Sequence, residues 1–188
     1  DIAQITRGVQ LLKEDLEQLS RDQTHYFLNV KDIENGRISY DEDTMLTYKK
    51  KDWLGKFDIK PNDIILTSKG STVRVAIVEE NYRPAFICGN LTKIRVNPAK
   101  YNAYVLYEFL QSEIGKRMIK GIQTGTTITL LNSSQLEKLK VPLFDIKFMN
   151  EIGNQIKDNK FEYEESIKAA ERRFYKNKER LLESLRFN

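Results

Sequence analysis

Apolar side chains recur every three or four residues along the C-terminal part of the chain. Between Met149 and Leu185, eleven positions follow this spacing, and nine of them are apolar or aromatic. The spacing is that of one face of an α-helix, and from Tyr163 to Leu181 it is close to the heptads of coiled coils. The pattern predicts one amphipathic helix that, at about 40 residues, is about 60 Å long. Such a helix extends beyond a globular domain and requires a partner helix.

The apolar face of this helix supplies the candidate interface between chains. We expect it to pair with the same helix of a second copy, or with the helix of a second globular unit. This divides the chain into a globular part, 1–143, and a helical part, 144–188. The candidate interface residues are Ile156, Tyr163, Ile167, Ala170, Phe174, Leu181 and Leu185.

The globular part combines strand and helix patterns. Segments 63–67 (DIILT), 73–78 (VRVAIV) and 91–96 (LTKIRV) are rich in β-branched residues and predict strands. The short polar segment 68–72 between the first two predicts a hairpin connection. No internal repeat is present, so we expect one globular unit of the α+β class.

Short helices are predicted at three places in the globular part. Asn97 and Pro98 resemble a helix start, followed by apolar residues at helical spacing that end near Gly121. Segment 134–137 (SQLE) has the spacing of a capping box, which predicts a helix start there. Segment 13–19 is a further candidate.

Composition narrows the setting of the protein. The only cysteine, Cys88, excludes an internal disulfide and a multi-cysteine zinc site, and it lies in an apolar stretch where a buried thiol is expected. This fits a reducing, cytoplasmic environment. No apolar run is long enough to span a membrane. The chain begins at Asp1 without a methionine, so we expect a processed product or a piece of a longer protein.

Charge is distributed unevenly along the chain, although the net charge is only +4. Residues 1–43 contain 5 basic and 10 acidic side chains, whereas residues 44–140 contain 16 and 8. A basic middle segment is typical of a surface that faces a polyanion, and a solvated basic surface gives the same pattern.

The residues needed for catalysis are not recognisable in the sequence. His25 is the only histidine, and no glycine-rich phosphate-binding motif occurs. We therefore predict no enzyme activity, no bound cofactor and no metal site. Glu79 and Glu80 are interpreted as a solvated turn, and Trp53 as a core residue.

Nucleic-acid binding requires cations for phosphates and polar side chains that reach base edges. The basic middle segment supplies both kinds of side chain. The candidate DNA contacts are Lys49, Lys50, Lys51, Ser68, Lys69, Ser71, Thr72, Arg74, Asn90, Thr92, Lys93, Gln123, Thr124, Thr126 and Thr127.

Several loose motifs occur in a fixed order along the chain. In that order the chain resembles the target recognition domain of type I restriction-modification specificity subunits over nearly its whole length. The motifs are 29–38 (NVKDIENGRI), 61–71 (PNDIILTSKGS), 75–78 (VAIV), 104–112 (YVLYEFLQS), 125–128 (GTTI) and 136–143 (LEKLKVPL), followed by the long helix.

The resemblance implies a globular domain built on a strongly bent β-sheet with short helices, and a coiled-coil-type helix that spaces two recognition domains. It implies that the domain reads a few base pairs of double-stranded DNA. It also implies that a partner methyltransferase uses S-adenosylmethionine to methylate adenine and that a restriction subunit cuts unmethylated DNA. Among the candidates it favours Lys69 and its neighbours, Lys93 and segment 123–127.

Several interpretations remain open from the sequence. With one recognition domain and one helix, the chain is either a half-subunit that dimerises or the C-terminal part of a methyltransferase fusion. An alternative class is a protein-interaction adaptor that pairs through its helix and does not bind DNA specifically. A third is an enzyme with an unrecognised site.

Overall fold

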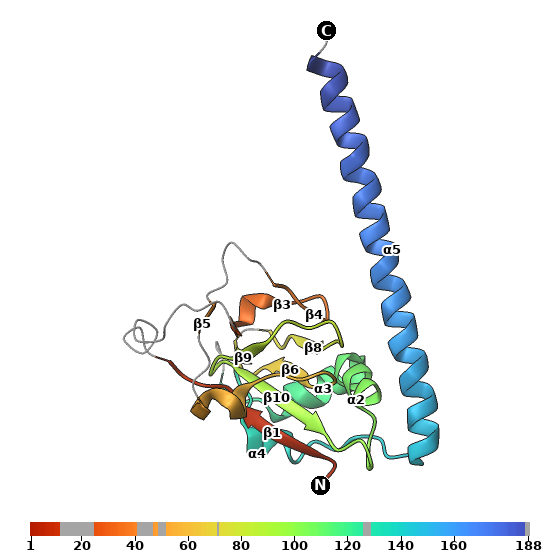
Figure 1. Ribbon diagram of the computed structural model, residues 1–188. Helices are drawn as coiled ribbons and strands as arrows, with labels where there is room; N and C mark the ends of the chain where they lie inside the picture. Colours follow the sequence, from red (N-terminus) through yellow and green to blue (C-terminus); the bar gives the residue numbers. More distant parts are fainter. Residues whose placement is uncertain (12–24, 41–46, 49–51, 71, 126–128, 187–188) are drawn as a thin grey trace.

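The computed structural model of the chain describes residues 1–11, 25–40, 47–48, 52–70, 72–125 and 129–186. It contains a mixed α+β domain with an antiparallel sheet and short helices, from which one long helix projects (Figure 1). The predicted fold class is therefore confirmed. The candidate helix at 13–19 lies outside the described residues.

The centre of the domain is a four-stranded antiparallel sheet in the order β1-β10-β6-β8. The strands are β1 (Ala3–Arg7), β10 (Leu91–Val96), β6 (Ile64–Thr67) and β8 (Val75–Ile77). The three strands predicted from β-branched residues are thus confirmed. β6 and β8 pair antiparallel as the predicted hairpin requires, with Leu66 opposite Val75.

The strands β6 and β8 are buried on both faces of the sheet, which explains why they are almost continuously apolar. In β6, Ile65 packs into a core with Phe27, Phe86 and Leu91, whereas Ile64 and its neighbour Leu66 face the opposite core. That second core is formed with the helices of the domain. Successive side chains of a strand point to opposite faces, so a single strand supplies both cores.

Smaller sheets surround the first core. In one of them, the central strand β2 pairs antiparallel with β5 and parallel with β9, and the other two sheets are two-stranded ribbons, β3 with β4 and β7 with β11. The bounds are β2 (His25–Leu28), β3 (Ile33–Glu34), β4 (Arg37–Ile38), β5 (Thr47–Tyr48), β7 (Lys69–Gly70), β9 (Ala85–Ile87), β11 (Thr129–Leu130), and the 3-10 helices η1 (Val30–Asp32) and η2 (Asp52–Phe57).

The predicted helix after Asn97 is two helices, α2 (Ala103–Gln111) and α3 (Glu113–Ile122). The prediction of its start was wrong: Asn97 organises a turn, and Asn102 caps α2 by accepting from the backbone N–H groups of Tyr104 and Val105. Ser112 separates the helices because its extended backbone ends α2 while its hydroxyl oxygen accepts from the Gly115 N–H at the start of α3.

The short helix expected at 134–137 is α4 (Ser133–Leu136). It starts slightly earlier than its sequence spacing indicates, because the capping box uses Asn132 and Gln135. The Gln135 side chain accepts from the backbone N–H of Asn132 at 2.7 Å.

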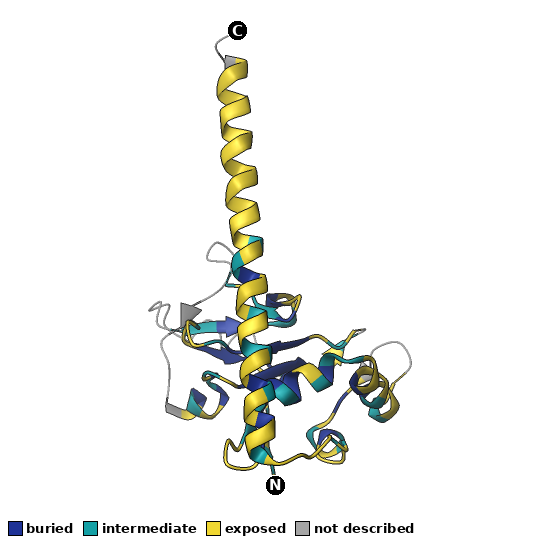
Figure 2. Ribbon diagram, turned by 90° about the vertical axis from the view of Figure 1, so that its right-hand side faces the viewer, coloured by how far each residue is buried: buried dark blue, intermediate teal, exposed yellow. Residues whose placement is uncertain are grey.

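The predicted long helix is confirmed as α5 (Ile146–Arg186). Its first turns pack against α2: Met149 and Gly153 are buried, Ile156 packs against the second core, and Asn102 Nδ2 donates to Asn150 Oδ1 at 3.1 Å. From Lys168 to Leu185 every residue is exposed, and Figure 2 shows this part standing clear of the domain. The first turns of α5 are therefore part of the domain's second core, and its distal part is an unpartnered arm.

Individual side chains test the remaining sequence interpretations. Cys88 is buried as expected. Trp53 was expected in the core, but its place on η2 leaves it 51% exposed. Glu79 and Glu80 were interpreted as a solvated turn, yet they pair with Lys160 and Lys157 of α5.

Within the described ranges, no helix is both long enough and apolar enough to cross a membrane.

Candidate nucleic-acid interface

Candidate DNA contacts gather at one end of the four-stranded sheet, where β6 ends and β8 and β10 begin. The backbone N–H of Ser68 donates to Asn90 O at 2.8 Å, which brings the two loops together. Lys69 follows at once and pairs with Leu130 in the ribbon β7–β11, and Leu130 in turn bridges to Thr124. The side chains of Lys69, Asn90 and Thr124 are exposed there.

A groove of about 660 Å³ lies beside this sheet end. Its walls come from the β3–β4 turn, the segment before β8, and helices α2 and α3. Three cations line it, and the described residues of its lining include no acidic side chain, so its field suits an anion. The lining residues are Asn35, Gly36, Thr72, Val73, Arg74, Val75, Leu110, Gln111, Lys116, Ile119, Lys120, Gln123 and Gly125.

Local backbone chemistry shapes the wall of the groove at Asn35 and Gly36. Both residues have positive φ, 48° and 79°, which is the conformation that an Asn-Gly hairpin turn requires. The buried hydroxyl of Tyr107 donates to Gly36 O at 3.1 Å and holds the turn in place. The Asn35 side chain is exposed beside the groove.

Arg74 connects the groove to the first core. Its Nη1 donates to Ile33 O at 3.1 Å, which anchors one edge of the guanidinium, while the residue as a whole is exposed. An arginine has five N–H donors in a fixed plane, so one edge can hold the fold while the other contacts a phosphate.

Three of the predicted contacts are not on the surface. Ser68, Thr92 and Lys93 are only 3%, 0% and 3% exposed. Thr92 and Lys93 lie in the middle of the sheet, on β10 between β1 and β6, and Ser68 continues from β6 beneath the loops. Burial thus corrects the expectation that these side chains contact DNA.

Lys93 instead joins η2 to the sheet. Its Nζ donates to Lys56 O at 3.0 Å and Asp58 O at 2.5 Å. Loss of water around the ammonium, reinforced by the neighbouring Arg95 cation, lowers the pKa of Lys93 to about 8. Arg95 is itself paired with the buried Asp63, with 2.6 Å between Nη2 and Oδ2. These charges have a structural role.

The remaining predicted contacts divide by position. Lys49, Lys50, Lys51, Ser71, Thr126 and Thr127 lie outside the described residues. Thr72, Arg74 and Gln123 line the groove. The amides of Asn35 and Gln111 were not among the predicted contacts. Lys116 and Lys120, which helical spacing places on one face of α3, belong to the basic middle segment that was expected to supply cations for phosphates.

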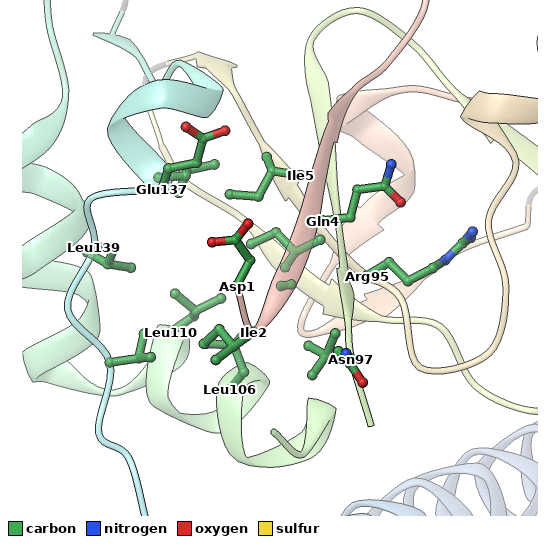
Figure 3. A pocket seen from close by; sticks show the side chains of 15 residues that line it. Asp1, Ile2, Gln4, Ile5, Arg95, Asn97, Leu106, Leu110, Glu137 and Leu139 are labelled. Atoms are coloured by element: carbon green, nitrogen blue, oxygen red, sulfur yellow. The ribbon is translucent and has the colours of Figure 1, made fainter. Parts of the chain in front are cut away.

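A second cavity, of about 990 Å³, has a different character. It lies between β1 and the segment around α4, and Figure 3 shows Leu110 and Leu139 on one side of it and Ile5 on the other. Asp1 and Glu137 provide negative charge at this site. Its described lining includes none of the predicted contacts and combines these two acidic side chains with one cationic side chain, Arg95, so it is a less favourable site for a phosphate backbone than the groove.

The predicted helix interface is largely open to solvent. Tyr163, Phe174, Leu181 and Leu185 are 63%, 63%, 67% and 73% exposed, and Ala170 is also exposed. Ile167 is half-buried, whereas Ile156 packs against the domain's own core. Phe161, Tyr175 and Leu182 add to the exposed apolar surface.

No group of three or more potential metal ligands occurs in the part of the chain that the structure describes. The groove contains cations and amides, which bind anions and base edges. Its chemistry is that of recognition.

Comparison with known proteins agrees with this chemistry. The family described as type I restriction modification DNA specificity domain matches residues 1–167. A search of curated protein sequences found no match.

Solved structures similar to the chain include an HsdS subunit and the S subunit of a type I restriction-modification system. The HsdS subunit from Thermoanaerobacter tengcongensis is 11% identical, with a TM-score of 0.54 over 86% of this chain and 36% of that one. The S subunit of the type I restriction-modification system from M. genitalium is 19% identical, with a TM-score of 0.49 over 82% and 35%. The chain thus spans little more than a third of either protein, and the first likeness is evidence of the fold alone. Since the family match extends over residues 1–167 of 188, the chain belongs to the type I restriction modification DNA specificity domain family.

Proposed function

We propose that this chain reads one half of a bipartite double-stranded DNA target and directs a DNA adenine methyltransferase to it. The observation that carries the proposal is the groove at the sheet end, where Arg74, Lys116 and Lys120 meet amide and hydroxyl side chains and no acidic side chain is found among the lining residues that the structure describes. The lysines position the phosphates, and Asn35, Gln111 and Gln123 are within the same groove to read base edges.

Contacts outside the groove extend the surface along the sheet end. Lys69, Asn90 and Thr124 are exposed there, as is Arg7, whose Nε donates to Gly89 O at 2.9 Å. Thr72 lines the groove and lies close in sequence to Lys69 of the outer group. In this proposal Lys93, Thr92 and Ser68 support the surface from inside.

The chain contributes recognition and its partners contribute catalysis. The methyltransferase, a separate subunit or a fused domain, binds S-adenosylmethionine and transfers the methyl group. A restriction subunit acts on unmethylated DNA.

Two copies of α5, or α5 and the helix of a second recognition domain, pair through the exposed stripe and set the distance between half-sites. The stripe supports this part of the proposal because Phe174, Leu181 and Leu185 are large apolar side chains left in water. Replacing Phe174 and Leu181 with Glu should give a monomer with unchanged domain stability, measured by sedimentation and urea unfolding. Replacing the exposed Lys176 and Lys178 with Glu is the control, and a dimer that persists in the first variant contradicts pairing through the stripe.

The test of recognition is selection of bound duplexes from a random library at moderate salt, first with the chain alone and then with the co-encoded methyltransferase. An enriched motif of a few base pairs, in one copy or two spaced copies, supports the proposal. Recovery of random sequence in both experiments contradicts it.

The exposed stripe also favours a second candidate, a protein-interaction adaptor that pairs through α5. In that case the chain co-purifies with a large protein partner and has no affinity for any duplex at low salt. The groove's cations argue against this candidate, and the two measurements together separate it from recognition.

A further inference from the structure

Among the described residues of α5 after Ile167, all from Lys168 to Leu185 are exposed, so the direction of the helix is set by contacts nearer its base. The distal arm from Glu164 to Arg186 is about 33 Å long at 1.5 Å per residue. A change of about 10° at Glu164 displaces its tip by about 6 Å, which is nearly two base-pair steps of 3.4 Å. A small change in the angle of α5 at its base therefore becomes a large displacement of its C-terminal end.

A cluster of charges holds α5 at this pivot. Glu164 is only 5% exposed, although it lies on a helix that is otherwise solvated at this level. Its Oε1 is 3.1 Å from Arg37 Nε on β4, and it also pairs with Lys160 one turn earlier. Lys160 Nζ in turn contacts Glu79 Oε1 at 2.7 Å, just after β8.

The cluster pairs two cations, Arg37 and Lys160, with two anions, Glu79 and Glu164. Burial of Lys160 favours its neutral form, but the hydrogen bonds to Glu164 and Glu79 outweigh this and raise the pKa of Lys160. Burial likewise opposes ionisation of Glu164, and the Lys160 ammonium outweighs it and lowers the pKa of that carboxyl. Removing one partner leaves a buried charge without its counterion, so the cluster is costly to break.

The same hairpin that supplies Arg37 also forms a wall of the DNA groove. Asn35 and Gly36, in the turn between β3 and β4, line the groove, and Arg37 is the next residue. The Arg37 guanidinium additionally lies 5.8 Å from the centre of the Tyr163 ring on α5. A single tight turn thus touches the groove on one side and the helix on the other.

We propose that the ion pair between Arg37 and Glu164 fixes the direction of α5 relative to the groove, and that Glu164 is a positioning residue for the distance between two DNA half-sites. The second half of this inference rests on the proposed recognition function. The first half concerns the free protein alone, so the two are tested separately.

The first experiment measures the direction of the helix without DNA. Spin labels are placed at Lys60→Cys and Lys176→Cys, both exposed positions, in a Cys88→Ala background, and labelled chains are diluted with unlabelled ones so that only distances within a chain are detected. Lys176 lies about 18 Å beyond Glu164 at 1.5 Å per residue, so a change of about 10° displaces this position by about 3 Å. We expect a narrow distance distribution that Glu164→Gln shifts or broadens by about that amount. Arg37→Gln, at a half-exposed position, provides a second variant that removes the same contact from the other side.

The matched control is Glu165→Gln, the same substitution at the neighbouring residue, whose carboxylate pairs with Lys168 of the same helix at 2.9 Å. It should leave the distribution unchanged. Unchanged distances in both Glu164→Gln and Arg37→Gln, or equal broadening by the control, overturn the positioning role.

The second experiment measures spacing. Duplexes that carry two copies of the selected motif at every spacing are competed for the full chain. The parent should enrich one spacing, and Glu164→Gln should accept a wider range while binding a single half-site as the parent does. A spacing preference that survives the substitution overturns the link to DNA. If the parent selects no motif, the recognition function fails and the link with it, whereas the distance measurement still decides the anchor.

Discussion

Neutralising two lysines of the groove gives a quantitative test of the phosphate contacts. Lys116 and Lys120 lie one turn apart on α3, and both are exposed in the groove lining. The logarithm of the binding constant falls with the logarithm of salt by about 0.9 for each phosphate contact on B-DNA. Loss of both contacts in Lys116→Gln/Lys120→Gln should lower the slope by about 1.8. Between 50 and 200 mM salt, the variant should then lose about 12-fold less affinity than the parent.

The assay is fluorescence anisotropy of a labelled duplex at several salt concentrations, with the slope as the readout. Lys138→Gln/Lys140→Gln is the control, because these lysines are also exposed but lie after α4, next to the second cavity. It removes the same charge and should leave the slope near that of the parent. An unchanged slope in the α3 variant, or an equal decrease in the control, refutes the assignment of phosphate contacts to the groove.

Two further predictions concern the stability of the domain. A Cβ at Gly115 would lie 2.0 Å from the Phe109 carbonyl oxygen, so Gly115→Ala should destabilise the domain by about 1–3 kcal/mol in urea unfolding. Gly121→Ala, on the same helix with nothing within 4 Å, should instead be neutral or stabilising by up to about 1 kcal/mol, and equal losses in both variants contradict the packing. Since the folded-state pKa of Lys93 is about 8 and its ordinary value 10.5, the unfolded chain binds more protons between these values, and stability should rise with pH in that window. Lys93→Met should lose this rise relative to the parent, whereas Lys100→Met, at an exposed position, should retain it.

The spacing of apolar residues predicted the main elements of the fold, because a strand or helix places its apolar residues at a spacing that is typical of that element. The β-branched runs at β6, β8 and β10 are buried on both faces, and the apolar face of α5 has helical spacing along its length. Helix boundaries were less accessible to sequence reasoning. Asn97 and Asn102 are both good capping residues, and only tertiary packing of α2 against α5 selects Asn102.

The candidate contacts show where sequence reasoning ends. The sequence does not show whether a lysine in a strand faces water or the interior. Nothing near Lys93 in the sequence indicated that the backbone carbonyls of Lys56 and Asp58 would accept hydrogen bonds from its ammonium group. Glu164 looked like one of many acidic residues on a solvated helix. Its partner Arg37 is distant in sequence, and only the three-dimensional placement of the β3–β4 hairpin brings the two together.

In this domain the core is built mainly by strands and helices and less by the connecting loops, and this division affects how the sequence can evolve. Both cores are formed mainly by the strands and helices, whereas Thr72, Arg74 and Asn90, three of the exposed candidate contacts, lie on connections at one end of the sheet. Replacement of an exposed side chain on a connection, such as Asn90 between β9 and β10, leaves core packing intact, so mutations there are filtered less by whether the protein folds than by what it contacts. If the chain reads DNA as proposed, a lineage can therefore acquire a new target preference by exchanging exposed side chains on these connections, with the inherited scaffold and its arm unchanged.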